Sequence, residues 1–320
     1  EPIGIGLFGD AVRFTIEYDQ AEPGAPATIA AKFPTAIEQV RATGAALGMY
    51  RIEVNFYEQI APHVPIRRPD CLYSGIDASG GEFGLLLEDM GPARSADQFA
   101  GCSRADAEHA MRQAAALHAP RFGDPALPDT DWLNSRYPTY AGVCAAIGDH
   151  FRTFRERYEH LVEPEYIALA ERYCDVAAPL AARAPRQSLI HGDYRLDNML
   201  FDAKGGEVPL VVLDWQSIGA ANPGNDTAYF LATSYPIDQR GRDERELLAL
   251  YHDELRRHGL NDYAWDDLWH DYRRGAWMAM ITAIAVSSMS KQTERGDRMF
   301  VSMFRGAAAQ MRDHDTLTLA

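Results

Sequence analysis

The chain has 320 residues, of which 47% are hydrophobic and 24% charged, as in a globular protein with a substantial core. Its 31 basic and 46 acidic side chains give a net charge of −15, which argues against nucleic acid or an anionic membrane surface as main partners. The four cysteines form no CxxC pair, and the longest apolar run, 276–286, is half the roughly 20 residues of a membrane helix. We therefore expect a cytoplasmic protein with reduced thiols and no secretory leader, and we expect that residues preceding Glu1 are missing.

The first ninety residues have the pattern of a strand-rich lobe with one helix. Apolar and polar residues alternate over 11–18 and 28–33, which predicts two strands, and 71–76 and 83–87 predict two more. Over 41–60 the apolar period becomes helical.

After Pro92 the pattern is mainly helical. Ser103 and Asp106 form a capping box that opens a helix ending at His118. Further helices are expected over 138–160, 164–183, 242–258, 264–290 and 296–313. Between them, 187–217 contains three short apolar runs, 188–190, 199–201 and 210–213. These patterns predict an α+β chain with a small lobe over 1–90 and a large helical lobe over 91–320.

Three glycines near the start, Gly4, Gly6 and Gly9, fit a GxGxxG pattern. In a dinucleotide-binding fold a helix would follow them, but here a strand pattern follows. A glycine turn between two strands is how protein kinases cover the phosphates of ATP, since backbone N–H groups approach closely where no Cβ intervenes. A simple hairpin turn is the alternative.

Lys32 and Glu53 are candidates for an ion pair. Lys32 lies on the strand face opposite its apolar neighbours, where a solvated lysine is the ordinary interpretation. Glu53 heads an apolar helical stripe (Phe56, Tyr57 and Ile60), so its carboxylate needs a cationic partner. Such a pair would hold the amine against the α- and β-phosphates of a nucleotide, although Glu58 competes for the role.

The most informative segment is 190–200, Ile-His-Gly-Asp-Tyr-Arg-Leu-Asp-Asn-Met-Leu, which reads as a loop between two apolar runs. Sixteen residues after Asn198, Asp214 emerges from a third run. Phosphoryl transfer needs a carboxylate that orients the substrate hydroxyl and oxygen ligands for Mg²⁺, and Asp193, Asn198 and Asp214 supply them. Arg195 stands where protein kinases place a lysine that neutralises charge on the γ-phosphate. Singly, such residues more often form turns; the ordered set is specific.

With these motifs the chain resembles the superfamily of aminoglycoside phosphotransferases and choline-kinase-like small-molecule kinases. The resemblance extends over nearly the whole chain and is sharpest over 191–201, 211–216 and 223–231. It implies a bilobal protein-kinase-like fold that uses ATP and Mg²⁺. Asp193 would be the catalytic base, Asn198 and Asp214 the Mg²⁺ ligands, and Lys32 with Glu53 the phosphate-anchoring pair.

The same resemblance assigns further residues. The segment from Glu88 to Met90 would be the hinge that meets adenine through its backbone. His191 would orient the catalytic loop, and Asp226 would brace that loop from a helix.

Departures from protein kinases concern the acceptor. Trp215 and Gln216 replace the Phe-Gly that follows the metal-binding aspartate, and no activation segment follows, so no protein substrate is expected. The motifs are closer to ecdysteroid- and choline-kinase-like proteins, and to kinase-like domains fused to some acyl-CoA dehydrogenases, than to antibiotic-resistance enzymes.

The sequence leaves the acceptor open. Residues 1–90 carry 6 basic and 13 acidic side chains, so the acidity is not concentrated in the large lobe. Acidic side chains near the C-terminus are expected on a solvated helix face: Asp253, Glu254, Asp266, Asp267 and Asp271. Four aromatic side chains could form an acceptor wall but fit a helical core better: Trp265, Trp269, Tyr272 and Trp277.

We therefore expect an ATP- and Mg²⁺-dependent enzyme that phosphorylates a hydroxyl of a small molecule. One alternative is a nucleotide-binding pseudokinase without turnover. A second takes His191, Asp193, Asp197 and Asp214 as a metallohydrolase cluster, which leaves Lys32, Glu53 and the glycines unexplained. The choice between ATP and GTP and the oligomeric state stay open.

Overall fold

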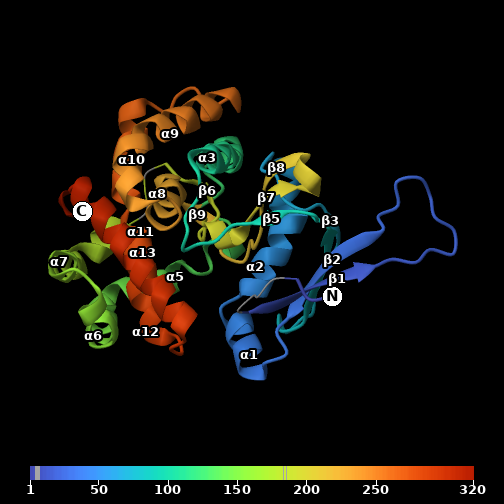
Figure 1. Ribbon diagram of the computed structural model, residues 1–320, viewed down its shortest axis with the longest axis horizontal. Coiled ribbons are helices and arrows are strands. Elements are labelled where there is room, and N and C mark those ends of the chain that lie inside the picture. The colour runs from blue at the N-terminus through green and yellow to red at the C-terminus, as the bar shows by residue number, and fades with distance from the viewer. Residues whose placement is uncertain (4–7, 183, 185) are drawn as a thin grey trace. The chain divides into compact units, whose positions relative to one another are not determined.

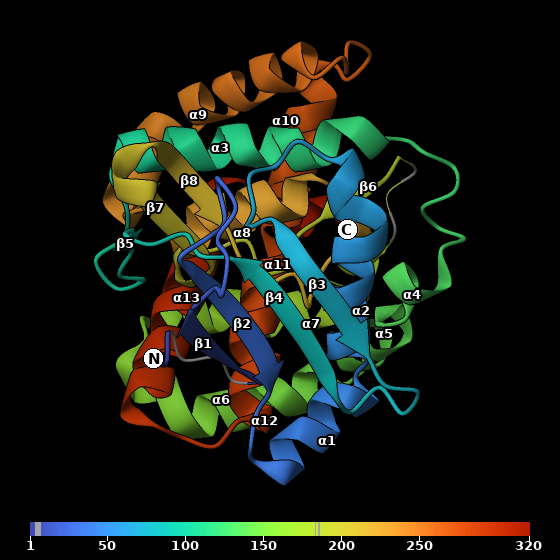
Figure 2. The same cartoon turned by 90° about the vertical axis from the view of Figure 1, so that its right-hand side faces the viewer.

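The computed structural model describes residues 1–3, 8–182, 184 and 186–320, which pack as two compact units. Unit 1 comprises residues 1–95 with 199–218, and unit 2 comprises 96–198 with 219–320. Residues 199–218, which the division at residue 90 assigned to the larger lobe, thus pack with the N-terminal residues. Figures 1 and 2 show the elements of the two units from two directions.

Unit 1 is built on a four-stranded antiparallel sheet with the order β1-β2-β4-β3. Its strands are β1 (Gly9–Thr15), β2 (Thr28–Pro34), β3 (Cys71–Ile76) and β4 (Phe83–Glu88). The four predicted strands are confirmed, although the first ends at Thr15 rather than at residue 18. Helix α2 (Met49–Asn55) packs against β3 and β4, as Figure 2 shows.

The predicted helix over 41–60 is wrong as a single element. Helix α1 (Glu38–Ala46) ends where Gly48 adopts a left-handed conformation (φ 69°) and donates its N–H to the Ala45 carbonyl at 2.9 Å. Glycine takes this conformation without the steric cost of a Cβ, so the chain turns there before α2 begins. A π-helical turn (Phe56–Ile60) then continues α2.

A second sheet of unit 1 has the order β5-β7-β8. It consists of β5 (Arg94–Ser95), β7 (Met199–Ala203) and β8 (Val208–Val212). The remaining apolar run of 187–217 forms β6 (Ser188–Ile190), which pairs in unit 2 with β9 (Gly219–Ala221).

Unit 2 is mainly helical. Its helices are α3 (Arg104–His118), α4 (Asp131–Asn134), α5 (Tyr137–Ala145), α6 (Ile147–Tyr158), α7 (Pro164–Ala181), α8 (Gly224–Thr233), α9 (Ile237–Arg257), α10 (Trp265–Gly275), α11 (Trp277–Ile281), α12 (Ser287–Met289) and α13 (Glu294–Asp313). The capping box is confirmed, because the Ser103 side chain accepts the N–H of Asp106. The spans 138–160 and 264–290 are not single helices, since the chain breaks at Ala146 and Ala276 and a π-helical turn (Thr282–Val286) precedes α12.

Helix α8 is buried along its whole length and packs against α9, α10, α11 and α13, as Figure 1 shows. Glycines permit these close contacts. A Cβ added at Gly275 of α10 would lie 2.3 Å from the carbonyl oxygen of Gly224, and one added at Gly306 of α13 would meet the Ala232 carbonyl at 1.8 Å. The position of α8 therefore depends on backbone-to-backbone packing.

The C-terminal aromatic residues divide between core and surface. Tyr272 and Trp277 are buried in the core, as the helical spacing favoured, whereas Trp265 and Trp269 are half-buried and stack on each other. In the described part of the chain, no helix combines the length and the apolar character needed to cross a membrane.

Candidate functional site

The glycine-rich segment is described only at its edges. Gly4 and Gly6 lie outside the described residues, and Gly9 is the first residue of β1. The flanking residues run antiparallel, with a bridge between Pro2 and Val12. A strand follows the glycines, as the sequence predicted, which is not the strand-turn-helix order of a dinucleotide-binding motif.

Lys32 is largely buried and faces two carboxylates. It pairs across the sheet with Leu85, which is fully buried, so its side chain lies on the inner face. Its Nζ donates to both carboxylate oxygens of Glu53 at 2.8 Å and to Oδ1 of Asp214 at 2.9 Å. Burial alone would lower the pKa of Lys32, but Asp214 and Glu53 together raise it. The ammonium group therefore stays charged.

Glu53 is buried in α2 and forms the ion pair expected with Lys32. Burial raises the pKa of its carboxyl group, the Lys32 ammonium opposes that shift, and the Asp214 charge adds to it. Glu58, the competing candidate, is exposed and accepts a hydrogen bond from Ser74 instead. The helix thus presents Glu53 alone of the two to the lysine.

Asp214 follows β8 in a left-handed backbone conformation (φ 64°), which is uncommon for a residue with a side chain. Its Oδ1 accepts from Lys32, and its Oδ2 accepts from the Gln216 side-chain amide at 3.1 Å. The next residue, Trp215, is fully buried and stacks on Phe56 with ring centroids 3.8 Å apart. This stacking holds the turn that directs the Asp214 carboxylate toward Lys32.

Glu88 and Met90 lie at the end of β4, where the hinge was expected. The Glu88 carboxylate pairs with Arg67 at 2.8 Å and with Lys204 at 3.2 Å. Met90 is buried against Ala203 and Val211, and its carbonyl accepts the N–H of Lys204 at 3.1 Å. The Glu88 side chain is therefore engaged in ion pairs within the protein.

One ion pair at this edge of the sheet was missed by the sequence analysis. Arg13 of β1 donates to both oxygens of Asp89, at 2.6 Å from Nε and 3.0 Å from Nη2. The hydrogen bond from Arg13 lowers the pKa of Asp89 to about 2. A Cβ at Gly91 would lie 2.6 Å from Nη2 of Arg13, so a larger residue there would have to displace the guanidinium. No local sequence pattern predicts this ion pair, since its two residues are 76 positions apart.

In unit 2 three donors surround Asp193, which lies in the loop that follows β6. Arg195 Nε and the Tyr229 hydroxyl each donate to Oδ1 at 3.0 Å, and the Asn198 side-chain amide donates to Oδ2 at 2.9 Å. A short 3₁₀ turn (Leu196–Asn198) brings Asn198 back to the aspartate. Tyr229 lies in α8 and was quoted in the sequence analysis only as part of a longer segment.

The loop carries its own charge balance. Burial would raise the pKa of Asp193, but the Arg195 charge and the hydrogen bonds from Asn198 and Tyr229 lower it on balance. Arg195 also donates to Asp197 at 2.6 Å, so its guanidinium bridges two carboxylates of the loop. Asp193 is therefore an ionised carboxylate with fixed orientation.

Helix α8 braces the loop through Asp226, as the resemblance implied. The Asp226 carboxylate accepts the backbone N–H of His191 at 2.6 Å and of Gly192 at 3.0 Å, and it contacts His118 Nε2 at 3.2 Å. The His191 ring accepts the N–H of Asp193 at 3.3 Å. These contacts orient the loop backbone.

A metal cluster of the hydrolase type was one alternative. Within the residues that the structure describes, no group of three or more His, Cys, Asp and Glu side chains is arranged to hold a metal ion. Of the residues named for it, His191 and Asp193 contact each other within the loop, while Asp214 pairs with Lys32.

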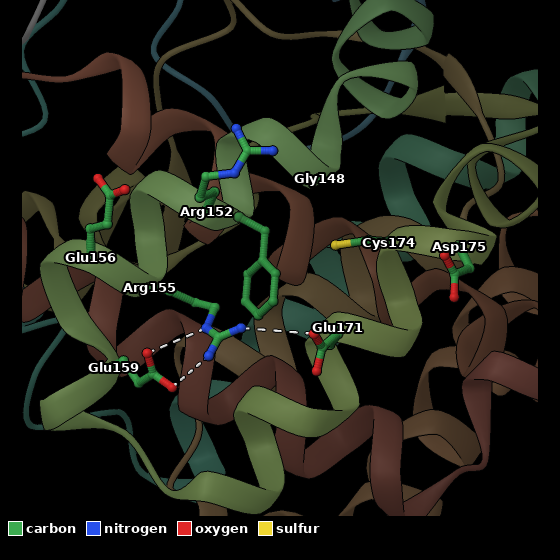
Figure 3. A pocket seen from close by; sticks show the side chains of 9 residues that line it. Gly148, Arg152, Arg155, Glu156, Glu159, Glu171, Cys174 and Asp175 are labelled. Atoms are coloured by element: carbon green, nitrogen blue, oxygen red, sulfur yellow. Dashed lines mark hydrogen bonds and ion pairs between the residues drawn. The ribbon is translucent and has the colours of Figure 1, made fainter.

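A cavity of about 510 Å³ lies between α6 and α7 (Figure 3). Arg155 crosses it, pairing with Glu159 at 2.9 Å and with Glu171 at 3.8 Å. None of the residues that line it is among the predicted site residues.

The sequence of this chain matches the phosphotransferase enzyme family (APH) over residues 39–269. A curated relative, acyl-CoA dehydrogenase family member 10 of Mus musculus, is 42% identical over 67 residues. That match covers 19% of this chain and 6% of the mouse protein, so the chain spans a small part of that relative.

Similar solved structures include a putative aminoglycoside phosphotransferase from Ralstonia eutropha, with a TM-score of 0.56 and 17% identity over 96% of this chain and 91% of that one. A microcompartment-associated aminopropanol kinase has a TM-score of 0.55 and 14% identity, covering 100% and 94%. The GDP complex of aminoglycoside 2'-phosphotransferase-IIIa has a TM-score of 0.55 and 14% identity, covering 97% and 92%. These similarities confirm the predicted α+β kinase-like fold.

Proposed function

Because the chain belongs to the phosphotransferase enzyme family, we propose that it transfers the γ-phosphate of ATP, with Mg²⁺, to a hydroxyl group of a small molecule. The family establishes the coarser statement, that the protein is a small-molecule phosphotransferase. The observation that supports the use of ATP is the largely buried Lys32 ammonium, which two carboxylates hold: Glu53 at 2.8 Å and Asp214 at 2.9 Å. An amine fixed in this way suits the α- and β-phosphates of a nucleotide.

The resemblance implies Asn198 and Asp214 as the ligands of Mg²⁺, and each side chain offers an oxygen atom for that role. The Asn198 amide nitrogen donates to Asp193, which leaves its amide oxygen as the ligand atom, and the Asp214 side chain keeps 27% of its surface exposed. Oxygen ligands of this kind are those that Mg²⁺ prefers. Bound there, the ion would neutralise charge on the phosphates. Lys32 can remain paired with Glu53 when Asp214 turns to a metal, since both Glu53 oxygens lie within reach of Nζ.

Asp193 orients the acceptor hydroxyl and takes its proton. A carboxylate with a lowered pKa is a weak base, and phosphoryl transfer through a loose transition state requires only late removal of the proton. Arg195 contacts Asp193, and its positive charge would neutralise charge on the transferred phosphoryl group.

The acceptor is a small alcohol rather than a protein. Similar structures include aminoglycoside phosphotransferases and an aminopropanol kinase, and some of the aminoglycoside phosphotransferases hold GDP or ADP. Aminoglycosides and amino alcohols are therefore among the acceptors to test, and ATP should be compared with GTP as the phosphate donor.

The test measures thermal stability with Mg·ATP, Mg·GTP and Mg²⁺ alone, followed by transfer of labelled γ-phosphate. A ligand at a hundredfold excess over its Kd stabilises the native state by about 2.7 kcal/mol. The acceptors would be aminoglycosides, amino alcohols, sterol-type alcohols and hydroxyacyl thioesters. Transfer in the wild type that is lost in Asp193→Asn supports the proposal. Nucleotide binding without transfer to any acceptor would favour the pseudokinase alternative.

A further inference from the structure

We propose that Tyr229 is a positioning residue that selects which oxygen of Asp193 receives the proton of the acceptor hydroxyl. This inference rests on the proposed function, in which Asp193 is the base. A hydrogen bond links the core helix α8 to the carboxylate of the loop. The Tyr229 hydroxyl donates it to Oδ1 of Asp193, at 3.0 Å.

Tyr229 can act only as a donor in this bond. Its ring is 1% exposed, and burial raises the pKa of its hydroxyl well above the ordinary value, with the Asp193 charge adding to the shift. Asp193 is ionised because its pKa is lowered. The proton therefore stays on the tyrosine, and the carboxylate accepts.

The donors are distributed unequally between the two oxygens. Oδ1 accepts from Tyr229 and from Arg195 Nε, both at 3.0 Å, whereas Oδ2 accepts from the Asn198 amide at 2.9 Å. Each carboxylate oxygen offers about two lone-pair positions. Both positions on Oδ1 are thus filled within the protein, while Oδ2 keeps one for an incoming hydroxyl.

Tyr229 also prevents the carboxylate from rotating. Arg195 is shared with Asp197, so it restrains Oδ1 less strictly than a donor on a rigid helix. Tyr229 lies three residues after Asp226, on the same side of α8, and Asp226 already holds the backbone of the loop. One helix therefore fixes both the backbone of the loop and the orientation of its catalytic carboxylate.

The proton transfer follows from this arrangement. The acceptor O–H bond breaks, its proton goes to Oδ2, and its electron pair forms the new bond to the γ-phosphorus. The bond from that phosphorus to the β,γ-bridging oxygen breaks, and its electron pair leaves with ADP. Asp193 ends protonated on Oδ2 and returns the proton to solvent.

The experiment compares Tyr229→Phe with the wild type in a steady-state assay at one pH, and it determines kcat and the KM for nucleotide separately. We expect kcat to fall about tenfold with the KM for nucleotide unchanged, because the carboxylate loses orientation and not its neighbours. A kcat equal to that of the wild type would overturn the inference.

Tyr272→Phe is the matched control. Tyr272 is equally buried and donates to another carboxylate, Glu244 Oε2, at 2.8 Å. Both variants should lose similar thermal stability, but only Tyr229→Phe should lose kcat. An equal loss of kcat in both variants would mean a general structural effect and would contradict the assignment.

Two further variants separate the possible failures. If Asp193→Asn keeps full turnover, the proposed base is wrong; if it is inactive while Tyr229→Phe equals the wild type, only the role of Tyr229 fails. Should Tyr229→Phe not fold, 4-fluorophenylalanine at position 229 replaces it, since this side chain nearly keeps the shape of tyrosine but donates no hydrogen bond. Its kcat should fall in the same way, and a kcat equal to that of the wild type would reject the proposal.

Discussion

Lys32 and Asp214 lie 182 positions apart in the chain, yet Nζ of the lysine is 2.9 Å from Oδ1 of the aspartate. The same Nζ is 2.8 Å from both oxygens of Glu53. One cation thus serves two carboxylates, and the group of three carries a net charge of −1 while both are ionised. Asp214 is the partner that can leave, since Glu53 is buried and Asp214 is partly exposed.

Asp214→Asn should abolish the stabilisation by Mg·nucleotide while leaving the protein folded. The amide cannot supply the charge that a divalent cation requires, and Lys32 keeps Glu53 as its partner. The measurement is the shift in Tm with Mg·ATP, which should disappear. Asp202→Asn, at an exposed carboxylate that pairs with Arg94, is the control and should retain the shift. A full shift in Asp214→Asn would contradict the ligand assignment.

Lys32→Met should destabilise the protein strongly at neutral pH. It leaves the buried Glu53 carboxylate beside Asp214 without a cation, and breaking a buried pair costs about 3–5 kcal/mol. Since the pKa of Glu53 is already raised and would rise further, its folded form gains protons more readily than the unfolded chain. The deficit should therefore shrink as the pH is lowered through that raised pKa.

Urea unfolding of Lys32→Met between pH 5 and 8 checks the sign of this dependence, over about the range where proteins are most stable. The double variant Lys32→Met/Glu53→Gln should recover part of the loss, because it removes the unpaired charge. A deficit that grows toward low pH would show that Glu53 is not its source.

Arg13→Met should remove the part of the acid dependence that comes from Asp89. The pKa of Asp89 is held at about 2, against an ordinary value of 3.8. This stabilisation is present above the ordinary value and is lost as the pH falls toward 2, and it amounts to about 2 kcal/mol. Unfolding free energies at pH 7 and pH 3 should therefore differ less in the variant.

Arg41→Met provides the comparison for Arg13. Its ion pair with Glu82 spans 3.2 Å between exposed side chains, and such pairs contribute about 0–1 kcal/mol. Equal effects of the two substitutions at pH 7 would mean that the Arg13–Asp89 pair has no special weight.

Two glycine-to-alanine substitutions in helices should act with opposite signs. Gly275→Ala places a Cβ 2.3 Å from the Gly224 carbonyl oxygen, so α8 and α10 must separate, at about 1–3 kcal/mol. At Gly241 of α9 nothing lies within 4 Å, and the higher helix propensity of alanine should stabilise the protein by up to about 1 kcal/mol. Differential scanning calorimetry of both variants decides, and the same sign for both would contradict the packing argument.

The parts that the sequence predicted are those with short-range causes. Asp193 and Asn198 are five positions apart in one loop, so the motif and its contact are nearly the same information. The capping box of Ser103 and the strand over 71–76 likewise depend on neighbouring residues. Family membership and fold class followed from such local motifs taken in order.

Other features were wrong or missed because their causes are tertiary. The helix expected over 41–60 ends at Gly48, where a left-handed residue outweighs the continuing apolar period. The sequence named Tyr229 only as part of the segment 223–231, and its hydrogen bond to Asp193 depends on α8 lying beside the loop.

The sequence by itself thus determined the residue types that phosphoryl transfer requires and the order in which they occur, because catalytic chemistry restricts side chains within short segments. The sequence predicted the pairing of Lys32 with Glu53, but only the tertiary structure decided the other charge contacts of unit 1. Strand pairing and helix packing bring Lys32 into contact with Asp214, 182 positions away, and Arg13 into contact with Asp89, 76 positions away. Such contacts produce no periodic pattern in the sequence, since the free energy that forms them comes from burial and from neutralising charge between residues far apart in the chain.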